Sequence, residues 1–384
     1  MWKKFLHLIK SATELLVWLI CICIPISKNK LVVVSYYGRG YGDNAKYIVD
    51  ELLKNKSDIR IIWLVKNETE AKTLPQGIEA CKYDSFKSIY HLSTAKVWLD
   101  NCRKGFCIKK RGQKYMQTWH GGGAQKRCEM DVEEVLGKYY VRVAKMDAKH
   151  TDIMVSDSRF MTELYLRAFW YNGEVLEVGY PRYDIIIKKD KTDIKNKVFS
   201  YFDLSGEKKT ILYAPTFRKD HDFAVYDVDY PALIDACKKR FGGDFIVLVH
   251  LHPNVADKFE QLKYDNIKIY NATYYPDMQE LIAVSDVLIG DYSSVNYEFS
   301  LAKKPVFRFA LDLENYKNDR NFYYPIEEYP YPLAQDNNEL VDNILNFDSE
   351  KYLKDLNEFF GRIGPAITDT ASEKCADWII EQMR

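Results

Sequence analysis

The sequence lacks an excess of charge of either sign, paired cysteines and a long apolar run. Its 384 residues include 55 basic and 55 acidic side chains, so the formal net charge is zero. Attraction to nucleic acid or anionic lipid therefore has to come from local patches, and we expect no nucleic-acid partner. The eight cysteines show no paired CxxC spacing of the kind that holds structural zinc. This pattern indicates free thiols in a reducing compartment.

Two common phosphate-binding motifs are also absent. The sequence contains no GxxxxGK[ST] motif and no GxGxxG between a strand and a helix. The stretch GRGYGDN at 38–44 has GxGxG spacing, and we interpret it as a tight turn after the first strand. The DVD at 227–229 resembles a metal-binding DxD motif, but it follows no strand, so we interpret it as a solvated loop. We therefore expect neither a metal ion nor another cofactor.

The first 30 residues form a segment of their own. Lys3, Lys4 and Lys10 precede an apolar run from Leu15 to Ile26. This run is shorter than the roughly 20 residues needed to span the hydrocarbon core of a bilayer. The sequence around Pro25 offers no small-residue cleavage site for a signal peptidase. We expect a helix that lies in the membrane interface with its lysines facing the headgroups. A spanning helix and a buried core helix are the alternatives.

Beyond residue 30, apolar runs typical of strands alternate with helical stretches. The runs are KLVVVSYY, IRIIWLV, AKVWLD and TDIMVS, and then TILYA, DFIVLVH, IKIY, DVLIG and PVFRF. This alternation predicts an α/β protein with parallel sheets. The polar stretch 188–197 between the two series predicts a connection between domains. We expect two Rossmann-like domains facing each other across a cleft, at 31–187 and 188–365, followed by a C-terminal helix at 366–384.

Polar residues follow the strands of the second series. Ligands of open parallel sheets bind outside the carboxyl ends of the strands. The residues at these ends are Pro215, Thr216, Arg218, His250, His252, Asp291, Ser293, Ser294 and Glu298. Serines at the start of a helix favour phosphate, because backbone N–H groups and the helix dipole point there. The alternative for the two serines is helix capping. Their combination with His252 and Arg218 at one edge predicts a phosphate site.

A second motif, MQTWHGGGAQKR at 116–127, places His120 against three consecutive glycines. Histidine titrates near neutral pH, so it can take a proton from a hydroxyl group. Glycines remove Cβ atoms and allow phosphates to approach the backbone closely. Lys126 and Arg127 would then hold an anionic acceptor. The alternative is a turn histidine flanked by glycines for structural reasons alone.

Six motifs occur in a fixed order: QTWHGG, VSDSRFMTELYLRAF, GYPRYD, LYAPTFR, HLHPN and SDVLIGDYSSVNYEFSLAKKPVFRFALDLENY. Together they resemble the CDP-glycerol glycerophosphotransferase family, the teichoic acid polymerases and primases of Gram-positive bacteria. The resemblance covers residues 31–365. It implies a GT-B-like fold in which the C-terminal domain holds a CDP-alcohol donor. The N-terminal domain would present an acceptor near the membrane.

The resemblance also implies roles for individual residues. His120 would be the general base, His252 would contact the donor phosphates, and the serines of DYSS would hold the pyrophosphate. Substrate binding is further implied for Trp119, Gly121, Gly122, Arg182, Pro215, Thr216, Arg218, His250, Asp291, Ser293, Ser294 and Glu298. The sequence departs from the family at Glu298, where aspartate is usual close to the ribose or cytidine. It departs again at 122–123, where the polymerases commonly have Thr-Pro.

The function that these observations predict is transfer of glycerol phosphate from CDP-glycerol to a hydroxyl of a lipid-linked or glycan acceptor. CMP is released, and the product is a cell-surface polymer of the teichoic acid or capsule type. The enzyme would work as a peripheral protein at the cytoplasmic face of the cell membrane. The alternatives are a CDP-ribitol donor, a GT-B glycosyltransferase that uses a nucleotide sugar, and a catalytically silent nucleotide-binding module. The oligomeric state stays open.

Overall fold

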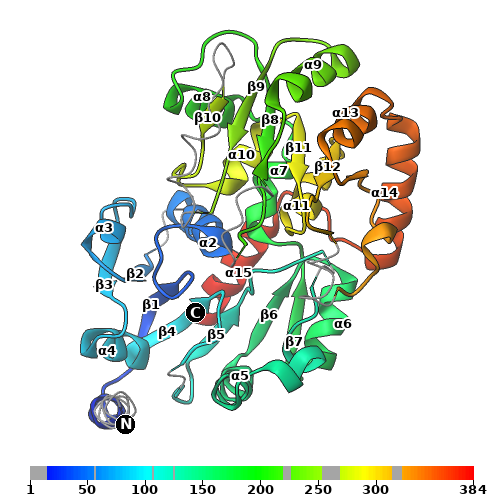
Figure 1. Ribbon diagram of the computed structural model, residues 1–384. Coiled ribbons are helices and arrows are strands. Elements are labelled where there is room, and N and C mark those ends of the chain that lie inside the picture. Colours follow the sequence, from blue (N-terminus) through cyan, green and yellow to red (C-terminus); the bar gives the residue numbers. More distant parts are fainter. Residues whose placement is uncertain are drawn as a thin grey trace, which may run out of the picture. The chain divides into compact units, whose positions relative to one another are not determined.

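The computed structural model describes residues 15–55, 58–105, 108–123, 126–218, 226–252, 269–313 and 322–384. The chain divides into two compact units (Figure 1). Unit 1 comprises Met1–His120, Cys128–Asp184 and Thr368–Arg384. Unit 2 comprises Gly121–Arg127 and Ile185–Ile367. The C-terminal helix therefore folds with unit 1, although its sequence follows the whole of unit 2.

Unit 1 contains a seven-stranded sheet in the order β3-β2-β1-β4-β5-β6-β7, and every described pairing is parallel. Its strands are β1 (Ser27–Val34), β2 (Arg60–Val65), β3 (Ile78–Lys82), β4 (Ala95–Asp100), β5 (Lys114–Gln117), β6 (Ile153–Ser156) and β7 (Glu174–Glu177). Strands β1, β2 and β4 contain the apolar runs LVVV, IIWLV and VWL, because the residues of these runs are buried on both faces of the sheet. Strands β3, β5 and β7 mix polar and apolar residues, and the sequence pattern did not predict them.

Beyond residue 34, the described part of unit 1 also contains helical elements. They are α2 (Asp43–Lys54), α3 (Glu68–Ala71), α4 (Phe86–Thr94), η1 (Glu129–Val135), α5 (Lys138–His150), α6 (Arg159–Ala168), η2 (Pro181–Tyr183) and α15 (Ala371–Met383). Helix α15 packs against α2, β4 and η2. The carboxylate of Asp184 accepts hydrogen bonds from the N–H groups of Ala371 and Ser372, at 3.1 and 2.8 Å. These bonds tie the start of α15 to the end of η2.

Unit 2 contains a six-stranded sheet in the order β10-β9-β8-β11-β12-β13, and its described pairings are also parallel. Its strands are β8 (Lys209–Tyr213), β9 (Phe245–Val249), β10 (Ile269–Asn271), β11 (Val287–Gly290), β12 (Val306–Phe309) and β13 (Leu333–Ala334). The other elements are α8 (Thr192–Tyr201), α9 (Tyr230–Phe241), α10 (Met278–Val284), α11 (Val295–Ser300), η5 (Ile326–Glu328), α13 (Asn337–Leu345) and α14 (Ser349–Ile363), and α7 (Asp184–Ile187) lies at the junction of the units. Within the stretch 188–197, predicted as a connection between domains, residues 192–197 begin helix α8.

Both sheets have the Rossmann strand order, in which the first strand lies at the centre and the order reverses beside it. The predicted α/β class with two parallel, Rossmann-like sheets is thus confirmed. The reversal falls between β1 and β4 in unit 1 and between β8 and β11 in unit 2. Loops leave these neighbouring strands in opposite directions, which opens a crevice for ligands at the carboxyl ends. Functional side chains are therefore expected after β1, β4, β8 and β11.

The apolar N-terminal run is helical at residues 15–21. Its side chains are largely exposed: Leu16 is 57% and Ile20 is 65% accessible. The helix is attached to the rest of unit 1 by hydrogen bonds from Trp18 Nε1 to the carbonyl of Ile108, and from Lys110 Nζ to the carbonyl of Cys21, at 3.0 and 3.3 Å. It is therefore not a buried core helix. Residues 1–14, which include the predicted lysines, lie outside the described part. No helix within the described residues is long and apolar enough to cross a bilayer.

Candidate active site

His120 follows β5, next to the carboxyl ends of β1 and β4. Its Nδ1 atom lies 2.6 Å from the main-chain carbonyl oxygen of Asn101, the residue after β4. A carbonyl oxygen only accepts hydrogen bonds, so Nδ1 carries a proton. The neutral ring therefore has its lone pair on Nε2, the nitrogen that can take a proton from a substrate. Burial lowers the pKa of His120 below its ordinary 6.5, although the Asn101 carbonyl and the Asp43 carboxylate act in the opposite direction.

The ring of His120 is held between aromatic neighbours. Trp119 stacks on it with ring centroids 4.5 Å apart, and Tyr36 lies at 5.4 Å. Trp119 adopts a left-handed backbone conformation with φ of 55°, which is strained for a bulky residue. Its N–H group donates to the side chain of Gln117 at 2.9 Å, and its carbonyl accepts from Asn44 at 3.3 Å. Backbone strain supported in this way is common where a side chain must be aimed at a substrate.

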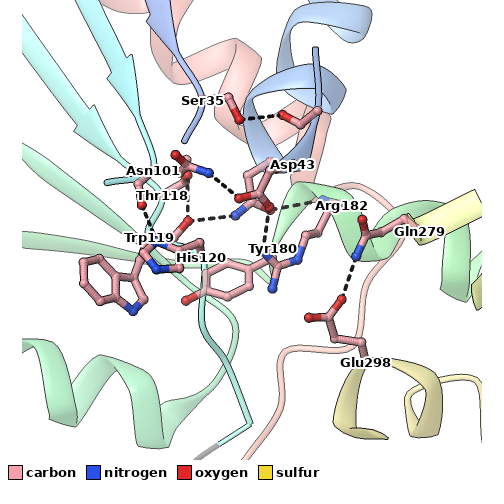
Figure 2. A network of polar contacts seen from close by, with 12 residues as sticks. Ser35, Asp43, Asn101, Thr118, Trp119, His120, Tyr180, Arg182, Gln279 and Glu298 are labelled. Atoms are coloured by element: carbon pink, nitrogen blue, oxygen red, sulfur yellow. Dashed lines mark hydrogen bonds and ion pairs between the residues drawn. The ribbon is translucent and has the colours of Figure 1, made fainter. Parts of the chain in front are cut away.

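A buried ion pair lies beside this histidine. Arg182 Nη1 is 2.6 Å from Asp43 Oδ1, and both side chains are less than 5% exposed. The other carboxylate oxygen of Asp43 accepts a hydrogen bond from the Asn101 side chain (Figure 2). The guanidinium of Arg182 also lies over the rings of Tyr180 and Tyr183, 5.2 Å from each centroid. Arg182, which the family resemblance assigned to substrate binding, is thus oriented by Asp43.

In unit 2, the predicted residues after β8 and β11 contact one another. Asp291 accepts hydrogen bonds from the N–H and the hydroxyl of Thr216, at 2.8 and 2.7 Å. Arg218 forms ion pairs with Asp291 at 2.9 Å and with Asp312 at 2.6 Å. Burial opposes the charge on Arg218, but the two carboxylates raise its pKa above the ordinary value. Arg218 and Asp291 therefore fix the Pro215–Thr216 turn at the carboxyl end of β8.

The two serines occupy the turn between β11 and α11. Ser294 is the N-cap residue of α11, but its hydroxyl makes no capping hydrogen bond. Instead it lies 3.5 Å from Glu298 Oε1, while Ser293 Oγ accepts a bond from the N–H of Val295 at 3.3 Å. Capping therefore accounts for Ser293 and not for Ser294. Glu298 is buried, and its second oxygen accepts from Gln279 at 2.7 Å (Figure 2).

The two histidines after β9 differ in their surroundings. His250 donates its main-chain N–H to the carbonyl of Tyr213 at 2.9 Å, which extends the pairing of β9 with β8. Burial lowers its pKa. His252 is exposed, and its ring lies 4.8 Å from the ring of Phe217. Of the two, His252 is thus the side chain that solvent and ligands can reach.

The glycine-rich segment 121–127 belongs to unit 2, one residue beyond His120. Gly123 has a φ of +71°, and a Cβ atom there would lie 2.3 Å from Cγ of Tyr297. Packing thus requires glycine at this position. Lys126 forms an isolated antiparallel bridge with Phe322, and Arg127 Nε donates to the carbonyl of Phe322 at 3.3 Å. The two predicted acceptor residues are therefore placed beside the segment that follows residue 321.

The DVD sequence has a structural explanation. The side chain of Asp229 accepts a hydrogen bond from the N–H of Ala232 at 3.0 Å and caps helix α9. Asp227 contributes its carbonyl, which accepts from the side chain of Asn337 at 2.9 Å. Throughout the described ranges, no group of three or more His, Cys, Asp and Glu side chains is arranged to hold a metal ion.

Three residues around His120 escaped the sequence analysis: Asp43, Asn44 and Asn101. Their position after strands is the signal that points to them, because ligands bind at the carboxyl ends of parallel strands. Asn101 follows AKVWLD directly, and KLVVVSYY leads into the GRGYGDN turn, which ends in Asp43 and Asn44.

Comparison with known proteins identifies the family. The sequence profile of the CDP-Glycerol:Poly(glycerophosphate) glycerophosphotransferase family matches residues 16–381. The chain belongs to this family. The match extends across both units, so it includes the loops that carry His120 and His252.

Several relatives are similar over most of the chain. The teichoic acid poly(glycerol phosphate) polymerases of Bacillus subtilis (strain 168) and Staphylococcus epidermidis are 31% and 30% identical over 86% and 94% of the chain. The chain spans about half of their length, 45% and 51%. The teichoic acid glycerol-phosphate transferase of Staphylococcus aureus is 28% identical, over 92% of this chain and 94% of its own.

Solved structures agree with this assignment. A structure of the wall teichoic acid polymerase TagF superposes with a TM-score of 0.85 and 28% identity, over 99% of this chain and 95% of the other. A structure of a TagF variant soaked with CDPG gives a TM-score of 0.84, over 97% and 94%. The UDP-GlcNAc 2-epimerase from Neisseria meningitidis shares the fold at a TM-score of 0.56 and 13% identity, over 92% and 99%. The GT-B-like class predicted from sequence is confirmed.

Proposed function

We propose that this protein transfers glycerol phosphate from CDP-glycerol to a hydroxyl group of a lipid-linked or glycan acceptor. The acceptor oxygen attacks the phosphorus that carries glycerol, a new P–O bond forms, and the bond to CMP breaks. CMP leaves with the electron pair, and the hydroxyl proton passes to His120. In-line transfer of this kind depends on positioning and electrostatics and needs no covalent nucleophile.

The observation that carries the proposal is the hydrogen bond from His120 Nδ1 to the Asn101 carbonyl. It leaves the lone pair of the neutral ring on Nε2, which is the form of histidine that can act as a general base. Membership of the glycerophosphotransferase family supports the choice of reaction. The two relatives named above at 30% and 31% identity are both poly(glycerol phosphate) polymerases, which supports glycerol as the alcohol.

Unit 2 is the proposed donor site. His252 and Ser294 offer an imidazole and a hydroxyl at the carboxyl ends of β9 and β11, where a nucleotide phosphate binds in a Rossmann-like sheet. Thr216, Arg218 and Asp291 form the wall of this proposed site. The positive charge of Arg218 is balanced by Asp291, so we do not assign it to the phosphates. We further propose that the phosphate charge is met by protein groups without a metal ion.

A donor screen tests this function. The purified protein is incubated with a short glycerol phosphate acceptor and CDP-glycerol, CDP-ribitol, UDP-glucose or UDP-N-acetylglucosamine, and CMP or UDP release is measured. We expect CMP release with CDP-glycerol at least tenfold faster than with any other donor. Faster turnover with CDP-ribitol would assign the ribitol reaction instead. UDP release would replace the proposal by a glycosyltransferase activity, and no release with any donor would refute an enzyme of either class.

Turnover in the presence of a chelator tests whether the reaction needs a metal ion. Turnover with CDP-glycerol should be unchanged by EDTA. Full loss in EDTA that a divalent ion restores would overturn the metal-free part of the proposal.

A further inference from the structure

The first two residues of α2, Asp43 and Asn44, connect three loops around His120. Asn44 is fully buried. Its amide nitrogen donates to the carbonyl of Trp119 at 3.3 Å, and its amide oxygen accepts from the N–H of Arg182 at 3.2 Å. Asp43 holds the Arg182 guanidinium with one oxygen and the Asn101 amide with the other (Figure 2). The two side chains therefore link the loops after β4 and β5 to η2.

The contact with Asn101 bears directly on the histidine. Asn101 is fully buried, and its own carbonyl accepts the Nδ1 hydrogen of His120. Its side-chain oxygen accepts from the N–H of Tyr36 at 2.9 Å, and Tyr36 lies against the His120 ring. Asp43 holds the remaining end of the Asn101 side chain. A shift of Asn101 would move the carbonyl that determines which nitrogen of His120 carries the proton.

The backbone of Asp43 supports a positional role. Its φ is +56°, in the left-handed region that non-glycine residues rarely adopt. Gly42 before it makes no side-chain contribution to the cap of α2. In this conformation both carboxylate oxygens of Asp43 are engaged, one with Arg182 and the other with Asn101, as a positioning role requires.

We propose that Asp43 and Asn44 form a positioning pair that fixes the tautomer and direction of the His120 base. This inference rests on the proposed function, because it assigns the role of a base to His120. Asp43 does not touch the substrate in this account. It acts through Asn101, and it keeps Arg182 in place beside the same ring.

The test compares Asp43→Asn with wild type. Asparagine keeps the shape of the side chain and loses the negative charge, so the Arg182 pair and the hold on Asn101 weaken together. We expect kcat with CDP-glycerol to fall about 10- to 100-fold, a part of the full contribution of a general base. The KM for the donor should stay within twofold, because its proposed contacts lie in unit 2. Asp84→Asn is the matched control: Asp84 also has a left-handed backbone, with φ of 58°, but its side chain is exposed.

A second readout follows the imidazole itself. The protein has seven histidines, and the ¹⁵N-labelled ring signals of His120 are identified by their loss in His120→Gln. At pH 7.5 the wild-type ring should be neutral with its proton on Nδ1. In Asp43→Asn we expect a mixture of tautomers. The charged groups that act on this ring are Asp43, Arg182 and Glu129. The negative charge of Asp43 raises the pKa of His120. Its removal should therefore lower the titration midpoint of the ring and shift the acid limb of the kcat/KM profile to lower pH.

The outcomes separate the two proposals. Loss of kcat with an unchanged tautomer and pH profile would mean that Asp43 is only structural, and unchanged kcat would also overturn the inference. An altered tautomer in a protein that uses none of the donors would keep the positioning pair and refute the proposed function. If Asp43→Asn does not fold, Asn101→Ala takes its place, because it removes the contact with Asp43 and retains the carbonyl. The same change in tautomer is then expected, and its absence counts against the proposal.

Discussion

At the scale of single residues, the chemistry of His120 depends on where one proton sits. The main-chain carbonyl of Asn101 holds that proton on Nδ1. Burial lowers the pKa of the ring, so the neutral and basic form persists to a lower pH than for a histidine in water. The position of the histidine in the chain is visible in the sequence. Its protonation state is a property of the neighbours that the fold brings to it.

The catalytic role of His120 is tested by substitution. His120→Ala should reduce transfer from CDP-glycerol by about 10²- to 10⁴-fold, because the attacking hydroxyl loses its base. Donor affinity should be unchanged. In the wild-type pH profile of kcat/KM, the midpoint of the acid limb should lie below pH 6.5, because burial lowers the pKa of the base. His150→Ala, at a partly exposed position on α5, is the control. A variant that retained more than about a tenth of wild-type turnover would exclude His120 as the base.

The donor contacts belong to the same scale. His252→Ala and Ser294→Ala should each weaken CDP-glycerol binding, because each removes a group directed at phosphate. A hydrogen bond to a charged group contributes about 1.5–3 kcal/mol, which corresponds to roughly 10- to 100-fold in affinity. Isothermal titration calorimetry measures this directly. Ser293→Ala is an informative comparison, since Ser293 is already engaged with the N–H of Val295, and it should have the smaller effect.

At the scale of elements, the glycine-rich segment illustrates two uses of one residue type. Gly123 is glycine because the ring of Tyr297 occupies the space of a side chain and because its φ is positive. For Gly121 and Gly122 the close approach of a phosphate stays a prediction. The third glycine therefore serves packing, whatever the first two do.

The packing role of Gly123 predicts a loss of stability. Gly123→Ala adds a Cβ atom 2.3 Å from Tyr297 in a left-handed conformation that alone costs about 1–2 kcal/mol. We expect the Tm to fall by several degrees, because about 1 kcal/mol corresponds to 2–4 °C for a domain of 150–250 residues. Gly361→Ala in α14 is the control. No atom lies within 4 Å of its added Cβ, and alanine favours a helix, so its Tm should not fall. Equal Tm values for both variants would contradict the packing argument.

At the scale of the whole molecule, the exposed apolar helix at residues 15–21 requires an explanation. Leu15, Leu16, Leu19 and Ile20 present 46–65% of their surface to solvent. Singly exposed apolar residues are common, but a contiguous group marks an interaction surface. Because a lipid-linked molecule is one of the two proposed kinds of acceptor, we propose that this helix places unit 1 on the cytoplasmic face of the membrane.

Membrane attachment is tested without truncation. The triple change Leu16→Glu, Leu19→Glu and Ile20→Glu should move the protein from the membrane to the soluble fraction. Burial of each such side chain contributes about 1.5–3 kcal/mol, so partitioning should fall more than tenfold. Turnover on a short soluble acceptor should persist. The matched control replaces three exposed aliphatic residues elsewhere, Leu166, Leu345 and Ile367, by glutamate.

Fractionation measures whether the protein is attached to the membrane, and an alkaline carbonate wash measures whether it is inserted. A triple variant that still pellets with membranes would place the contact surface elsewhere. Wild-type protein that resists the wash would indicate an inserted segment, because a surface helix should be extracted.

Local chemistry determined a large part of this protein. Apolar runs predicted β1, β2, β4, β8 and β9, because parallel strands that are covered on both faces have near-continuous apolar sequences. The order of motifs pointed to the family, and the strand-end rule brought Thr216, Asp291 and Ser294 to one edge of one sheet. Strands β3, β5 and β7 were missed because IEACK, KYMQ and EVLE mix polar and apolar residues, and β13 was missed because it has only two residues.

Only the tertiary structure decided which of these groups face a ligand and which face each other. Arg218 is as basic in the sequence as any phosphate-binding arginine, yet in the fold it is paired with Asp291 and Asp312. Asp43 stands 58 residues before Asn101 and 139 before Arg182, and nothing local marks it as their partner. The local sequence determines the type of each side chain and the periodic patterns that predict helices and strands. Charge pairing, the tautomer of His120 and the strain at Trp119 arise between segments far apart in the sequence, so they exist only once the sheets have brought those segments together.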